Sequence, residues 1–124
     1  MASKFTELIV DAVDPGRLAQ FWMAALGWEP TGKYDESVEF GSVIEIADSV
    51  APGPSLVFVP VPEPKLLKNR LHLDLNPVDC DQAQEVARLI DLGARRTDYL
   101  RSRVRRGELG PSRPSELSAN RRKT

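Results

Sequence analysis

Two residues whose side chains can bind a metal or move a proton, Glu7 and His72, stand 65 positions apart in similar surroundings. Each lies in an alternating apolar stretch that predicts a β-strand, and each is followed seven residues later by an aspartate, Asp14 or Asp79. A carboxylate and an imidazole are both ligands for divalent metals, and either can act as a general acid or base. Glu7 and His72 are therefore the candidate catalytic and metal-binding residues.

The first of these strands opens a βαβββ pattern. Residues 5–12 alternate so that Glu7 points away from the apolar side of the strand. Asp14, followed by a proline, predicts the start of a helix, and Gly27 predicts its end in a left-handed conformation. Three β-like runs then follow without another helix, at residues 28–33, 38–46 and 56–61.

A second, shorter copy of the pattern begins at residues 71–75, where His72 points away from three alternating leucines. A helix is predicted at residues 83–92 and one more strand near residues 95–99. Such a repeat predicts an α+β fold of two βαβββ modules, with helices outside a curved mixed sheet and the second module incomplete. The modules are expected at about residues 5–61 and 71–99.

The composition of the chain changes near Leu100. Residues 1–99 carry 16 acidic and 9 basic side chains, whereas residues 100–124 carry 2 acidic and 8 basic ones. This Arg/Ser/Pro-rich tail has no aromatic residue and is typical of a disordered segment. The folded domain is thus expected at residues 5–99. We hypothesise that the reading frame was altered near Leu100, so that the tail replaced the closing strands of the second module.

Several classes of protein do not fit the sequence. Its apolar runs are too short for a membrane helix, and an N-terminus without a long apolar segment predicts a cytoplasmic protein. The single cysteine, Cys80, excludes an internal disulfide and a cysteine-rich zinc site, and is interpreted as a bystander thiol. Nucleic acid is not an expected partner, because the tail has no aromatic side chain for stacking and the acidic body would repel phosphate.

Four segments carry a resemblance to a known family. They are Asp14-Pro-Gly-Arg-Leu-Ala-Gln-Phe-Trp22, Leu26-Gly-Trp28, Val61-Pro-Glu-Pro-Lys65 and Lys68-Asn-Arg-Leu-His-Leu-Asp-Leu75. In this order the chain resembles the glyoxalase-like branch of the vicinal oxygen chelate superfamily, which includes glyoxalase I, extradiol dioxygenases, fosfomycin-resistance enzymes and bleomycin-binding proteins. The resemblance spans about residues 5–99 and implies a cavity shared by two modules.

The resemblance also implies a divalent metal that chelates two adjacent oxygens of a substrate and acts as a Lewis acid. Glu7 and His72 match the first-strand ligand positions of the two modules. The last strand of the first module and the tail carry no matching ligand, so a divalent metal is left open but not favoured. Three cationic residues could attract an anionic ligand or form a solvated loop: Lys65, Lys68 and Arg70.

The expected function is binding or transformation of a small oxygen-rich molecule. Whether the protein is an enzyme stays open; if so, it would be a metal-dependent lyase, isomerase or dioxygenase. The alternatives are metal-free sequestration of an antibiotic-type small molecule, or a catalytically impaired, truncated family member. The expected partners are a small-molecule ligand and a second copy of the chain, because an incomplete sheet leaves an open edge for a homodimer.

Overall fold

The computed structural model describes residues 1–34, 37–96 and 117–118, and the chain divides into two units, Met1–Leu67 and Lys68–Thr124. No helix in the described ranges has both the length and the apolar character needed to cross a membrane.

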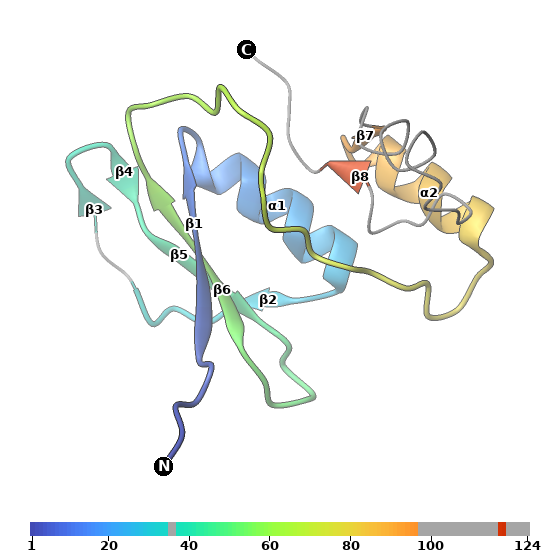
Figure 1. The fold of residues 1–124 in the computed structure, drawn as a ribbon, viewed down its shortest axis with the longest axis horizontal. Helices are drawn as coiled ribbons and strands as arrows, with labels where there is room; N and C mark the ends of the chain where they lie inside the picture. The colour runs from blue at the N-terminus through green and yellow to red at the C-terminus, as the bar shows by residue number, and fades with distance from the viewer. Residues whose placement is uncertain (35–36, 97–116, 119–124) are drawn as a thin grey trace. The chain divides into compact units, whose positions relative to one another are not determined.

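The first unit contains a four-stranded mixed sheet and one helix (Figure 1). Its main elements are β1 (Glu7–Ala12), α1 (Pro15–Leu26), β2 (Glu29–Pro30), β5 (Ile44–Ala47) and β6 (Ser55–Pro60). The strand order is β1-β6-β5-β2, with β1 and β6 parallel and the other pairs antiparallel. The element order confirms the predicted α+β class and the βαβββ pattern of the first module.

The sheet is open and uncurled, which corrects the prediction of a curved sheet. Curling around a cavity needs more long, tilted strands than this unit provides, because β2 has only two residues and β5 only four. A short hairpin, β3 (Ser37–Val38) with β4 (Gly41–Ser42), forms a two-stranded antiparallel sheet of its own.

The predicted ends of α1 are confirmed. Asp14 caps the helix, and its Oδ1 accepts a hydrogen bond from the backbone N–H of Arg17 at 3.2 Å. Pro15 occupies the first turn, where no N–H is needed. Gly27 has φ 69°, the left-handed conformation that a residue without a β-carbon adopts without strain. These local signals fix where the helix begins and ends.

The core of the first unit lies between α1 and one face of the sheet. Its buried members are Ala19 from the helix, Ile46 from β5, and Leu56 and Phe58 from β6. Partly buried side chains surround them: Leu8, Val10, Leu18, Trp22, Met23, Leu26, Trp28 and Ile44. Burying a large apolar side chain contributes about 1.5–3 kcal/mol. Since Leu8 and Val10 face this core, alternation places Glu7 on the opposite, helix-free face.

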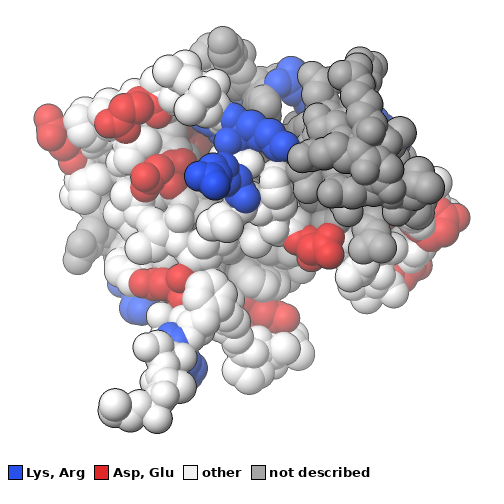
Figure 2. All heavy atoms as spheres, viewed as in Figure 1, with Lys and Arg blue, Asp and Glu red and all other residues white. Residues whose placement is uncertain are grey.

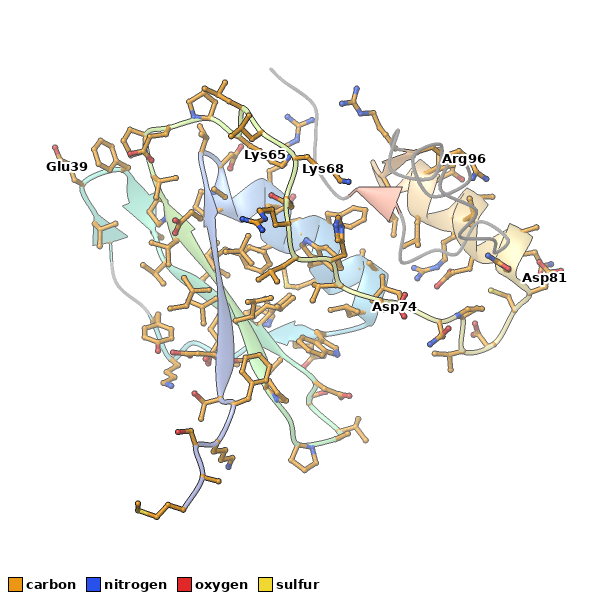
Figure 3. All side chains as sticks on the ribbon, viewed as in Figure 1. Glu39, Lys65, Lys68, Asp74, Asp81 and Arg96 are labelled. Atoms are coloured by element: carbon orange, nitrogen blue, oxygen red, sulfur yellow. The ribbon has the colours of Figure 1, made fainter. Side chains whose placement is uncertain are left out.

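The second unit contains α2 (Gln82–Asp91) and two short antiparallel strands, β7 (Arg95–Arg96) and β8 (Leu117–Ser118). Asp81 starts α2 with a reciprocal capping box: its carboxylate accepts from the Gln84 N–H, and the Gln84 side chain accepts from the Asp81 N–H. Figure 3 shows Asp81 at this end of the helix.

The helical period of the sequence predicts a buried stripe of Ala83, Val86, Ala87 and Ile90 on α2, but of these four residues the structure buries Val86 alone. Val86 and Leu89 are buried together with Ala94, whereas Ile90 is 43% exposed. The chain reverses after the helix, and the N–H of Ala94 bonds to the carbonyl of Leu89 at 2.9 Å. This hydrogen bond places Ala94 beside the last turn of α2, next to the buried Leu89.

The prediction of a strand at residues 71–75 is wrong. These residues have no regular secondary structure, and Leu71 is 80% exposed. Alternation of apolar residues favours a strand only when a neighbouring strand supplies hydrogen bonds and an apolar surface. Among the described residues no strand pairs with this segment, so its alternating residues do not form a strand.

The last predicted strand is present as β7, shorter than expected; residues 97–99 lie outside the described part of the chain. The predictions for the tail fall mostly on residues 97–116 and 119–124, which also lie outside it. Its described residues are Leu117 and Ser118, which pair with Arg96 and Arg95.

Candidate functional site

The helix-free face of the first sheet carries two carboxylates near one another. The register of the strands pairs Glu7 on β1 with Ser55 on β6, and Glu45 on β5 with Val57. The Ser55 hydroxyl donates to Glu45 Oε2 at 2.8 Å, which links β6 to β5 beside Glu7. This end of the face is the site that the sheet builds around Glu7.

Glu45 is the buried member of the site, with 7% of its surface exposed. Besides Ser55, the hydroxyl of Thr31 donates to its Oε1 at 2.5 Å. Burial alone would raise the pKa of the Glu45 carboxyl, but the hydrogen bonds from Thr31 and Ser55 and the charge of Lys33 outweigh it and lower the pKa. Glu45 is therefore held as a carboxylate.

Glu7 is the more accessible carboxylate, with 23% of its side chain exposed. The Tyr34 hydroxyl donates to it and lies 3.1 Å from Oε1 and 3.2 Å from Oε2. The Lys33 ammonium lies 4.0 Å from Oε2 and 5.1 Å from the centre of the Tyr34 ring. Interaction with Tyr34, then the charges of Glu45 and Glu7, raises the pKa of Lys33.

This arrangement can hold a small polar molecule beside an exposed apolar side chain. Glu7 offers carboxylate oxygens to a hydroxyl or amine, and Tyr34 and Lys33 offer donors to an oxygen atom. Next along β1 on the same face is Ile9, which is 58% exposed. A ligand with an oxygen-bearing end and a carbon skeleton matches both parts.

The other predicted site residue, His72, lies in the second unit, in the irregular segment before α2, and is exposed. Because Glu7 and His72 belong to different units, a shared role stays a prediction. Lys65, Lys68 and Arg70 are exposed as well. Figure 3 labels the first two on the chain between β6 and α2.

The described residues do not assemble a metal centre. Over residues 1–34, 37–96 and 117–118, no three His, Cys, Asp or Glu side chains come together in a way that could hold a metal ion. Glu7 and Glu45 are two carboxylates, and their oxygens already accept from Tyr34, Thr31 and Ser55. This donor set does not fit a divalent metal, which in catalytic sites typically has three protein ligands.

Two other features carry no site. Burial, and then the charges of Glu85, Asp79 and Asp81, raise the pKa of the Cys80 thiol, which is the wrong direction for a nucleophile. Figure 2 shows acidic side chains at several separate places on the visible face rather than in one patch.

Sequence reasoning found Glu7 but missed Glu45, Tyr34 and Lys33. One signal was available: Glu45 stands between Ile44 and Ile46, so alternation places a carboxylate on the face opposite the core. Its contact with Thr31 joins residues 14 positions apart, which spacing alone does not reveal.

A protein-family model matches most of the chain. The model of the glyoxalase-like domain matches residues 7–109. The chain belongs to the glyoxalase-like domain family. This confirms the resemblance to the vicinal oxygen chelate superfamily, and the match extends beyond Leu100. No curated protein and no solved structure matches the chain.

Proposed function

We propose that this glyoxalase-like domain binds a small oxygen-rich molecule at the Glu7 end of the helix-free sheet face, without a metal. The supporting observation is the convergence of Tyr34 and Lys33 on the Glu7 carboxylate, 3.1 and 4.0 Å away, over a buried second carboxylate. A ligand hydroxyl replaces the Lys33 contact to Glu7, while the ammonium or the phenol donates to a neighbouring ligand oxygen. The carbon skeleton lies on Ile9.

Metal-free binding is favoured over catalysis because the two carboxylates already have protein donors as partners. The enzymatic alternative needs Glu7 and His72 to act together as metal ligands, with a substrate that chelates the metal. The two readings differ in one measurable property, which is whether ligand binding depends on a divalent metal.

The test is a thermal-shift screen of the full chain against α-hydroxycarbonyl compounds, catechols and polyols, with and without a chelator. A ligand at ten times its Kd stabilises the folded state by about 1.4 kcal/mol, which corresponds to a rise in Tm of several degrees. The expected hit keeps its shift in the chelator and loses most of it in Glu7→Gln and in Tyr34→Phe.

The matched control is Glu39→Gln, which removes a carboxylate from the exposed hairpin between β3 and β4 (Figure 3). This variant is expected to keep the full shift. A hit that needs added metal would replace the proposal by the enzymatic reading. A hit that Glu7→Gln leaves unchanged would place the ligand elsewhere and refute the proposed site.

We also propose that the chain forms a homodimer. β1 is an edge strand of the sheet, and among the described residues no strand pairs with its outer edge. An open edge presents backbone donors and acceptors that a second copy can use. Light scattering after size exclusion should give twice the 13.8 kDa chain mass; a constant monomer mass at all concentrations would contradict it. A cytoplasmic location stays a prediction.

A further inference from the structure

The residues that reach Glu7, Lys33 and Tyr34, belong to an exposed connection after β2, not to a strand of the sheet. Gly32, with φ 72°, turns the chain just before them. A connection of this kind has few buried contacts of its own, and such segments open easily. For Tyr34 to stay within hydrogen-bond distance of Glu7, residues 31–34 must therefore be fixed by contacts with the sheet.

Glu45 makes the contacts that hold this connection. Its carbonyl accepts from the Thr31 N–H at 2.9 Å, and its carboxylate accepts from the Thr31 hydroxyl. The same Thr31 hydroxyl oxygen accepts from the N–H of Lys33 at 3.2 Å. Glu45 thus anchors Thr31 twice, and Thr31 in turn fixes the backbone of Lys33, next to Tyr34.

The cost of burying Glu45 points to the same role. Placing a carboxylate in a protein interior costs several kcal/mol, and its partners often only repay that cost, so such a group is weak evidence for stability. Glu45, however, supplies a fixed acceptor for the Thr31 and Ser55 hydroxyls, and so a defined position for the connection.

We propose that Glu45 is a positioning residue that holds residues 31–34 in place, so that Tyr34 and Lys33 contact Glu7. This inference rests on the proposed function for its biological meaning, because it concerns the site at which the ligand is placed. Glu45 itself is too buried to contact a ligand. It acts through Thr31, and the property it controls is the contact between Tyr34 and Glu7.

The test measures that contact directly, by nuclear Overhauser effects between the Tyr34 ring and the Glu7 side chain in the full chain. The wild type is expected to show these cross-peaks, and Glu45→Ala to lose them while the amide signals of α1 stay in place. Glu45→Gln, which keeps the shape and an acceptor oxygen, is expected to retain them. If Glu45→Ala retains the cross-peaks, the proposal is overturned.

Two further variants separate positioning from stability. Ile46→Val removes one buried methylene beside Glu45, which lowers the stability slightly, and this variant is expected to keep the cross-peaks. If this variant loses them as Glu45→Ala does, Glu45 has only a structural role. Thr31→Val, which keeps the shape but removes the hydroxyl, should weaken the cross-peaks even if Glu45→Ala does not fold; unchanged cross-peaks would overturn the proposal. Because no ligand is used, the result is independent of whether the ligand screen succeeds.

Discussion

Replacing Phe58 by alanine should remove a large part of the stability of the first unit. Phe58 is fully buried on β6 and packs in the core with Ala19, Ile46 and Leu56. The lost transfer free energy and the cavity left by the ring together cost about 3–5 kcal/mol. Domains of this size are stable by only about 5–15 kcal/mol, so this loss is large enough to be measured by equilibrium unfolding.

Urea unfolding followed by tryptophan fluorescence measures this effect selectively. Both tryptophans, Trp22 and Trp28, pack against the core that contains Phe58. With a urea slope of about 2 kcal/mol/M, the midpoint should fall by about 2 M. Val50→Ala, at a position 91% exposed, is the control and should change the free energy of unfolding by less than about 0.5 kcal/mol. A loss below about 1 kcal/mol for Phe58→Ala would refute the described packing of α1 on the sheet.

Three other outcomes are expected. Because the pKa of Glu45 is lower in the folded state than its usual 4.5, its contribution to stability is present above about pH 4.5 and is lost as the pH falls through the folded pKa. In an acid titration, Glu45→Gln should therefore lose less of its free energy of unfolding than the wild type. An identical loss in both proteins would contradict this expectation. Metal analysis of purified protein should find no stoichiometric, chelator-resistant metal; if metal is found, Glu7→Gln or His72→Ala should abolish it. Translating the encoding DNA in its other two frames past codon 100 should give alternating strands with an Asp-Pro-x-Gly-type turn in one of them, and the frame-change hypothesis fails if neither does.

The elements that the sequence predicted well are those fixed by local chemistry. Asp14, Pro15 and Gly27 define the ends of α1 through contacts within a few residues, and the alternation of residues 5–12 predicted which side of β1 faces the core. The family resemblance was also readable, because its motifs are continuous segments.

The features that the sequence did not predict depend on partners distant along the chain. Residues 71–75 alternate like a strand, but alternation does not create the neighbouring strand that such a segment needs. The site was only half predicted for the same reason. Glu7 was found from its place in the repeat. Tyr34 contacts Glu7 across 27 positions of the sequence, and Glu45 contacts Ser55 and Thr31 across 10 and 14 positions, so only the folded sheet brings these residues together.

The most direct test of the proposed site is an NMR titration of the full chain with the compound that gives the largest thermal shift. Binding at the Glu7 end of the helix-free face predicts the largest changes at the amides of Glu7, Ile9, Tyr34, Glu45 and Ser55, with little change along α1. Changes confined to α1 or α2, with these five amides unaffected, would contradict the proposed binding site.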